Sequence, residues 1–169
     1  EELSSMDAAS DRCALELSDA KVDVMGYACL VAIMSMGLGY HRKSQERLTG
    51  VVRENDSDAA VVNSAGSLIE ALLAMKAKRI AIIAPYMKPL AQMVFDYIAA
   101  EGFDVVDSRA LEIQDNLAVA AHDQANLPGI VSSMNVADAD VIVLSACVQM
   151  PSLAAVQTVE ALTGKPVIT

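Results

Sequence analysis

Two cysteines, Cys29 and Cys147, stand out as residues that could carry chemistry. They lie in two similar segments, Asp23-Val-Met-Gly-Tyr-Ala-Cys29-Leu-Val31 and Asp140-Val-Ile-Val-Leu-Ser-Ala-Cys147-Val148. In each segment an apolar run is followed by Ala-Cys, which is typical of a strand that ends where a turn or helix begins. Backbone N–H groups at such a junction stabilise a thiolate, which is the reactive form of cysteine. A thiolate and a thiol that flank one small cavity can add to an activated carbon and transfer a proton.

The third cysteine and the two histidines are not predicted to belong to this site. Cys13 lies on a polar helical segment without a matching motif, so we interpret it as structural. His41 and His122 lie in unrelated helical segments, and we expect both to be solvated surface residues. Because the sequence has no Cys-x-x-Cys pair, it does not predict a metal site.

Two further residues have a functional and a structural interpretation. Tyr86 follows Ala84-Pro85 at the end of an apolar run, where its phenol would point toward the same edge as the cysteines. It could equally be an ordinary packed tyrosine. Asn116 precedes a helical segment and could simply be its N-cap.

The elements that must position these residues alternate between helix and strand. Helices are predicted at residues 3–18, 41–54, 67–75, 88–101, 116–122, 129–136 and 152–163. Strands are predicted at residues 22–28, 59–62, 80–84, 103–106 and 140–144, and another begins at 165–169. Short Val/Ile runs separated by helices are typical of a parallel sheet in an α/β fold. The cysteines would then lie at the carboxyl ends of strands, the edge where open parallel sheets bind ligands.

Composition excludes several classes of protein. No apolar run approaches the roughly 18–20 residues that cross a bilayer, so we expect a soluble protein without a membrane partner. A net charge of −10 with scattered Lys and Arg argues against a nucleic-acid surface. There is no Gly-x-Gly-x-x-Gly or Walker-type loop, so a nucleotide cofactor has no support. Three cysteines do not suggest a disulfide framework, which favours the reducing cytoplasm.

The cysteine segments resemble those of the aspartate/glutamate racemase superfamily, and specifically its maleate cis–trans isomerase branch. Three further segments support the resemblance: Asn63-Ser-Ala-Gly, Lys78-Arg-Ile-Ala-Ile-Ile-Ala-Pro-Tyr-Met87 and Ile113-Gln-Asp-Asn116. They occur in the order that this branch shows and cover nearly the whole chain. The sequence is similar to the bacterial maleate isomerases of nicotinate degradation.

The resemblance implies a cofactor-independent isomerisation of maleate to fumarate. Cys29 would be the nucleophile that attacks the double bond, and Cys147 would supply and remove the proton at the neighbouring carbon. The intermediate would be a succinyl-cysteine. The resemblance also implies substrate-binding positions for the maleate carboxylates: Leu30, Val31, Tyr86, Asn116 and Val148.

The resemblance further implies two pseudo-symmetric α/β lobes with the active site in the cleft between them. Residues 1–63 would form the C-terminal portion of the first lobe, and residues 64–169 the second. The family uses an Asn after its first strand, and this sequence begins beyond that strand, so we expect the first lobe to be incomplete. The family commonly forms homodimers or larger homo-oligomers.

Three other functions are compatible with parts of this pattern. An amino-acid racemase of the same superfamily also uses two cysteines, but it would need a site for an ammonium group. An arylmalonate decarboxylase is disfavoured because that branch lacks a cysteine at the first position. A non-catalytic protein that binds small dicarboxylates would tolerate the loss of Cys29, since binding needs donors but no nucleophile.

Overall fold

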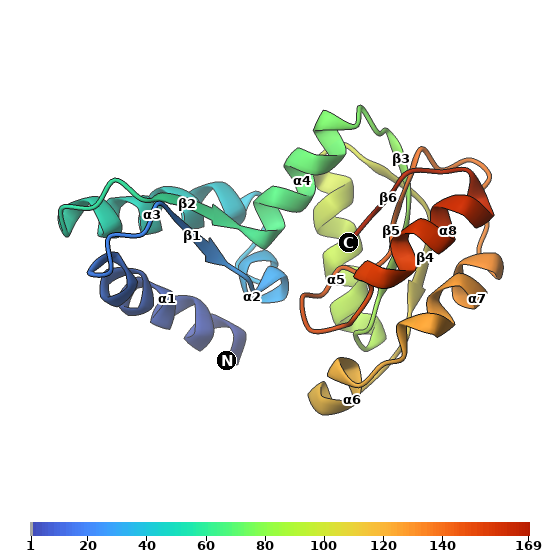
Figure 1. Ribbon diagram of the computed structural model, residues 1–169, viewed down its shortest axis with the longest axis horizontal. Coiled ribbons are helices and arrows are strands. Elements are labelled where there is room, and N and C mark those ends of the chain that lie inside the picture. The colour runs from blue at the N-terminus through green and yellow to red at the C-terminus, as the bar shows by residue number, and fades with distance from the viewer. Residues whose placement is uncertain (1) are drawn as a thin grey trace. The chain divides into compact units, whose positions relative to one another are not determined.

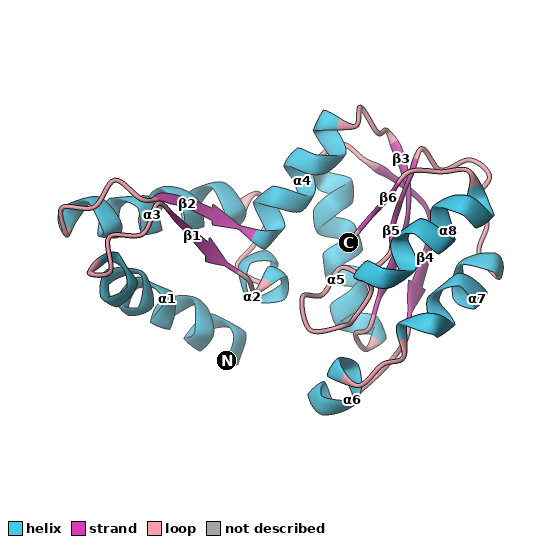
Figure 2. Ribbon diagram, viewed as in Figure 1, coloured by secondary structure: helices cyan, strands magenta, loops and turns pink. Residues whose placement is uncertain are grey.

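The computed structural model describes residues 2–169 (Figure 1). The chain divides into two compact units, residues 1–70 and 71–169, and the division falls within helix α4 (Ser64–Ala74). The lobe boundary that the sequence predicts between residues 63 and 64 stays a prediction. Both units combine parallel strands with helices (Figure 2). The predicted α/β class, with parallel sheets flanked by helices, is therefore confirmed.

Unit 1 is built around two parallel strands. Its elements, in chain order, are α1 (Glu2–Ser18), β1 (Val24–Tyr27), α2 (Leu30–Met34), α3 (Tyr40–Glu54) and β2 (Ala60–Asn63), followed by the first turns of α4. The register pairs Val24 with Ala60 and Tyr27 with Asn63. Because the strands are parallel, the residues that follow Tyr27 and Asn63 emerge at the same edge.

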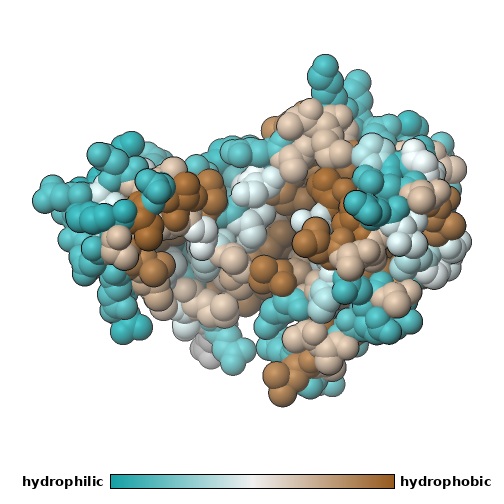
Figure 3. Space-filling view, in the orientation of Figure 1, coloured by the Kyte–Doolittle hydropathy of each residue, from teal (hydrophilic) through white to brown (hydrophobic). Residues whose placement is uncertain are grey.

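One face of this small sheet is covered and the other is open. Met25 and Val61 are buried in a core that also contains Leu48 and Val52 of α3. On the opposite face Val24 is 59% exposed and Val62 is 40% exposed. Apolar residues gather over β1 and β2 in Figure 3. The alternation of burial along each strand is the pattern expected of a sheet that is covered on one side.

Unit 2 contains a four-stranded parallel sheet in the order β4-β3-β5-β6. Its strands are β3 (Arg79–Ala84), β4 (Asp104–Ala110), β5 (Val141–Val143) and β6 (Val167–Ile168). Its helices are α5 (Lys88–Ala100), α6 (Asn116–Ala120), η1 (Gln124–Asn126), α7 (Leu127–Ser132), η2 (Leu153–Ala155) and α8 (Val156–Thr163). Helices α7 and α8 lie on one face of the sheet and α5 on the other (Figure 1).

The central strands of unit 2 are buried on both faces. Every residue from Ile80 to Ala84 in β3 and from Val141 to Val143 in β5 is buried. Residues such as Ile83, Ile142 and Leu144 form a core with Leu127 and other apolar residues of the helices. This burial explains why both strands are short continuous apolar runs in the sequence.

A carboxylate aligns the two central strands. Asp140, just before β5, accepts hydrogen bonds from the backbone N–H groups of Lys78 (3.0 Å) and Arg79 (2.8 Å) at the start of β3. These bonds lower the pKa of Asp140. They hold the register in which Ile80 pairs with Val141. Val143, the last residue of β5, pairs with Ile82, and β3 continues to Ala84, so the segments that follow the two strands begin at the same edge of the sheet.

Two expectations about the histidines are wrong. His41 is buried, at 5% exposure, because α3 packs its 41, 44, 48 and 52 face against the core. Its carbonyl oxygen accepts a hydrogen bond from Asn63 Nδ2 at 2.8 Å. His122 is half-buried, and its Nδ1 atom is shielded from solvent.

None of the helices formed by the described residues combines the length and the hydropathy that a membrane span requires.

Candidate active site

The order of the strands in unit 2 creates a natural binding edge. The chain runs from β3 to β4 on one side of β3, and then returns to form β5 on the other side. The connections that leave β3 and β5 therefore diverge. In open α/β sheets, a crevice for ligands forms outside the carboxyl ends of two strands at such a switch point. Tyr86 follows β3 and Cys147 follows β5, so both lie at this point.

Tyr86 links the two loops directly. Its Oη donates a hydrogen bond of 2.7 Å to the carbonyl oxygen of Ala146. Ala146 N–H in turn donates to the carbonyl oxygen of Ile83 at 3.1 Å. The phenol thus lies beside the residue that immediately precedes Cys147. Since a phenol has one hydrogen to donate, this bond must open before Tyr86 can donate to a bound carboxylate.

The backbone at Cys147 is held by a serine that the sequence analysis did not single out. Ser145 is buried, at 4% exposure, and its Oγ donates to the carbonyl oxygen of Cys147 at 3.0 Å. The same Oγ accepts the N–H of Cys147 at 3.2 Å. This pair of bonds shapes the turn that presents the half-buried cysteine. A turn, and not an α-helix, follows Cys147.

The loop after β4 lies against the loop after β3. Leu111 N–H donates to the carbonyl oxygen of Ala84 (2.9 Å), Ile113 N–H to that of Pro85 (2.9 Å) and Glu112 N–H to that of Tyr86 (3.3 Å). Asn116 begins α6 directly after this loop. Tyr86 and Cys147 therefore lie in loops and Asn116 lies at the start of α6, and all three follow the carboxyl ends of strands of the unit 2 sheet.

Asn116 is not the N-cap of α6. The cap is Asp115, whose side chain accepts the N–H groups of Leu117 (3.2 Å) and Ala118 (3.3 Å). A carboxylate at this position accepts the first free N–H groups of the helix and favours the positive end of its dipole. The Asn116 side chain is therefore not needed as a cap.

The same edge exposes apolar side chains. Val148 is 69% exposed and Leu117 is 79% exposed. They follow Cys147 and Asn116 in the sequence. Apolar residues around a few polar groups are the usual lining of a small-molecule site, because the polar groups orient the ligand while the apolar ones exclude water.

Cys29 occupies the corresponding kind of position in unit 1. It is half-buried, lies just beyond the end of β1, and is the N-cap of α2 with φ −128° and ψ 87°. Its side chain makes no capping hydrogen bond. Leu30 and Val31 are the first two residues of α2, and N–H groups in the first turn of a helix have no acceptor within the helix. Unit 1 therefore combines a thiol with backbone donors suited to an anion.

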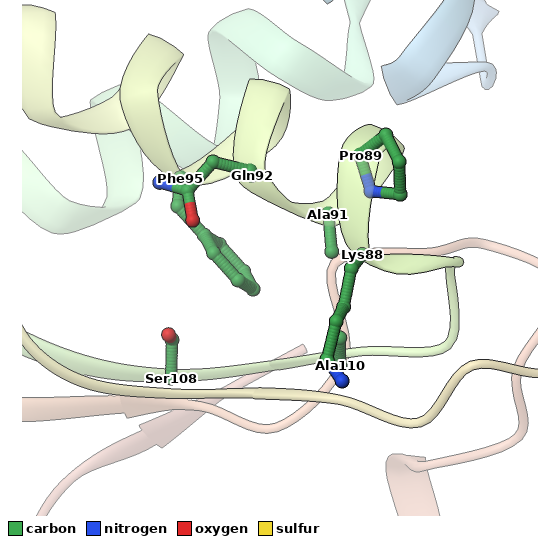
Figure 4. Close-up of a pocket in the computed structure, with 7 residues that line it drawn as sticks. All are labelled: Lys88, Pro89, Ala91, Gln92, Phe95, Ser108 and Ala110. Carbon is green, nitrogen blue, oxygen red and sulfur yellow. The ribbon is translucent and has the colours of Figure 1, made fainter.

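A separate pocket of about 460 Å³ lies between α5 and the edge strand β4 (Figure 4). It is lined by Lys88, Pro89, Ala91, Gln92, Phe95, Ser108 and Ala110. Lys88 Nζ is 3.0 Å from Glu112 Oε1, so its charge is already paired. The predicted site residues are not among its lining residues, and we assign this pocket no role.

The geometry of unit 2, with a cysteine and a phenol at the switch point of a parallel sheet, is that of an α/β enzyme that uses thiol chemistry. The family model described as arylmalonate decarboxylase matches residues 8–169. A maleate isomerase from Pseudomonas putida is 69% identical over 169 residues, which are the whole of this chain and 68% of that protein. The chain therefore belongs to the arylmalonate decarboxylase family and, within it, to the maleate isomerases.

Two solved structures are closely similar to this chain. One is a cysteine-to-alanine variant of the maleate isomerase Iso from Pseudomonas putida S16 with maleate, at TM-score 0.98 and 65% identity. It matches 99% of this chain and 67% of that one. The other is a cysteine-to-serine mutant of the Nocardia farcinica maleate cis–trans isomerase, with a covalently bound succinylcysteine intermediate, at TM-score 0.95 and 42% identity. It matches 98% of this chain and 68% of that one, so this chain spans about two thirds of the length of these relatives.

Proposed function

We propose that this protein isomerises maleate to fumarate without a cofactor, with Cys29 as the nucleophile and Cys147 as the acid and base. One observation carries the proposal: both cysteines lie in the segments that follow parallel strands, in a chain whose Nocardia relative was solved with a succinylcysteine intermediate. The proposal requires one residue from each unit to act on the same substrate.

The two thiols suffice to balance the reaction. The Cys29 thiolate forms a carbon–sulfur bond with one alkene carbon, and Cys147 gives its proton to the other, so the π bond is lost. The remaining single bond rotates. The Cys147 thiolate then takes a proton back while the carbon–sulfur bond breaks, and the trans double bond forms. Covalent addition thus removes the rotational barrier, and no oxidant or reductant is consumed.

Neutral donors would hold the two carboxylates of the substrate. We assign this role to the backbone N–H groups of Leu30, Val31 and Val148 and to the side chains of Tyr86 and Asn116. The overall charge of −10 gives a dianion no long-range attraction. Local donors at the ends of strands and helices supply the attraction instead.

The activity is tested by adding maleate to the protein and following fumarate by proton NMR. Appearance of fumarate without added cofactor supports the proposal. If no fumarate forms, the proposal is wrong, and amino-acid racemisation is tested next by uptake of solvent deuterium at Cα. A protein that only binds dicarboxylates would show maleate binding without turnover, and its binding would survive replacement of Cys29.

Replacing Tyr86 with phenylalanine should raise the KM for maleate by about tenfold, because one donor to a carboxylate is lost. The change also removes the bond to Ala146, so kcat should fall if that bond positions Cys147. Tyr97 is a buried tyrosine within α5. The variant Tyr97→Phe is the matched control and should leave KM unchanged. An unchanged KM in Tyr86→Phe would remove Tyr86 from the substrate site.

We also propose the setting in which the protein acts. Two free thiols must stay reduced for the reaction, which favours the cytoplasm. The resemblance to enzymes of nicotinate degradation suggests that maleate reaches this protein from that route. A homodimer or larger homo-oligomer is the expected assembly, and size-exclusion chromatography with light scattering measures it.

A further inference from the structure

Unit 1 contains a polar cluster that the proposed reaction does not use. Asp7 of α1 is 3% exposed, and its Oδ2 accepts hydrogen bonds from Tyr40 Oη (2.7 Å) and Arg47 Nη2 (3.0 Å) of α3. Arg47 Nη1 also pairs with Asp11 Oδ1 at 2.5 Å. Arg47 Nη2 lies 3.2 Å from Ser10 Oγ. A partly buried ion pair of this kind is weak evidence of a purely stabilising role, because desolvation of Asp7 offsets part of its attraction.

The cluster leaves buried polar atoms without partners. Asp7 Oδ1, Arg47 Nε and Tyr27 Oη are all shielded from solvent, and none has a hydrogen-bond partner among residues 2–169. Leaving a buried polar group unpaired costs about 1–3 kcal/mol, so native proteins keep few of them. Three such atoms around the Asp7–Arg47 pair call for an explanation other than stability.

Tyr27 is the last residue of β1, two residues before Cys29. Along this segment Met25 is buried, Tyr27 and Cys29 are half-buried, and Val24, Gly26 and Ala28 are exposed. Cys29 has φ −128° and ψ 87°, because the chain leaves the strand and enters α2 at this residue. Residues i and i+2 of a strand share a face, and the alternation of burial continues from Met25 through Tyr27 to Cys29, so we place the side chains of Tyr27 and Cys29 on the same covered side.

The surroundings keep the Tyr27 phenol protonated. Burial raises its pKa to about 12, and the negative charge of Asp7 adds to the effect, as does a charge on Cys29. Tyr40 acts in the same direction, and Arg47 opposes it. At neutral pH the hydroxyl is therefore an intact donor.

We propose that Tyr27 is a positioning residue for Cys29, whose uncommitted buried hydroxyl donates a hydrogen bond to the sulfur when the sulfur is a thiolate. The sulfur turns toward this donor by rotation about the Cα–Cβ bond. Such a bond stabilises the attacking thiolate, and it also stabilises the thiolate released when the carbon–sulfur bond breaks. The inference rests on the proposed function for its role in catalysis, but its physical basis is a property of unit 1 alone.

The test is the rate at which iodoacetamide alkylates each cysteine, measured by peptide mass spectrometry in the wild type and in Tyr27→Phe. Loss of a charge-assisted donor should slow alkylation of Cys29 by about tenfold at neutral pH. Cys13, which is exposed on α1 of the same unit, is the internal control and should react at an unchanged rate. Since Tyr27 Oη has no partner, the substitution breaks no hydrogen bond, and the Tm should not fall.

Tyr40→Phe is the matched variant, because it removes a hydroxyl from the same cluster that is bonded to Asp7. It should leave alkylation of Cys29 unchanged. The proposal is overturned if Tyr27→Phe leaves the Cys29 rate unchanged, or raises it as a loosened fold would. It is also overturned if both variants slow Cys29 equally.

Turnover of maleate gives a separate reading of the same variants. Tyr27→Phe should lower kcat with KM unchanged, because the donor acts on the sulfur and not on the carboxylates. Failure of the proposed function would appear as no turnover in the wild type, with the difference in alkylation rate intact. Failure of this inference would appear as wild-type turnover with no difference between Tyr27→Phe and the wild type.

Discussion

Cys29→Ser is expected to lower the rate of fumarate formation from maleate by at least about 1000-fold, because loss of a covalent nucleophile removes the only route that breaks the double bond. Serine is nearly isosteric with cysteine but ionises far less readily, so Cys29→Ser keeps the local packing while it loses the nucleophile. The measurement is the initial rate of fumarate appearance by proton NMR at saturating maleate.

Cys13→Ser provides the control for this substitution. Cys13 is exposed on α1, in the same unit, and has no role in the proposed reaction. Its replacement should leave the rate unchanged. Substantial turnover in Cys29→Ser, with a fold preserved by circular dichroism, would contradict the assignment of Cys29 as nucleophile and favour a mechanism in which both thiols only transfer protons.

Cys147→Ser is expected to lower turnover by about 100-fold or more, since general acid–base catalysis contributes about 10²–10⁴-fold. The defect should differ in kind from that of Cys29→Ser. Cys29 is still able to add to maleate, with a proton supplied slowly by water, but the adduct cannot be resolved efficiently. A burst of bound substrate followed by slow release, measured by rapid quench, is the expected result.

The hydrogen bonds at Ser145 explain why this substitution should be selective. They involve only the backbone N–H and carbonyl oxygen of Cys147, so the turn survives when the side chain changes. Equal loss of adduct formation in Cys147→Ser and Cys29→Ser would contradict separate roles for the two thiols.

The α/β class could be predicted because strands buried on both faces leave a direct mark in the sequence. Composition alone predicts strands at Ile80-Ala-Ile-Ile-Ala84 and Val141-Ile-Val143, and no knowledge of tertiary contacts is needed. Strand β4 was harder to delimit: it extends to Ala110, beyond the predicted end at residue 106. As an edge strand it contains Asp107, Ser108 and Arg109, so its second half lacks an apolar pattern.

Parts of the candidate site depend on the order of the strands, which a single sequence does not reveal. Tyr86 and Cys147 become neighbours because β5 returns to the far side of β3 from β4. The bond from Tyr86 to Ala146 and the support of Cys147 by Ser145 follow from that order. The suggestion that Tyr86 is directed toward the strand ends came from the Pro-Tyr pair, and only the fold supplies its partner.

His41 and Tyr27 show where sequence patterns mislead. His41 begins a segment rich in charge, and its burial depends on which face of α3 meets the sheet. In the sequence, Tyr27 is one more apolar residue of a predicted strand. Its hydroxyl can be recognised as buried and unpaired only in the folded unit, where α1 and α3 bring Asp7 and Arg47 close to it. Long-range packing, which leaves no local signal, decides both cases.

The most direct test of the covalent mechanism is peptide mapping of Cys147→Ser after incubation with maleate. We expect a succinyl group on Cys29 and none on Cys13, with the modified fraction rising with maleate concentration and reaching saturation. The result that would contradict it is the absence of any adduct on Cys29, or a succinyl group on another residue, in a protein whose wild type forms fumarate.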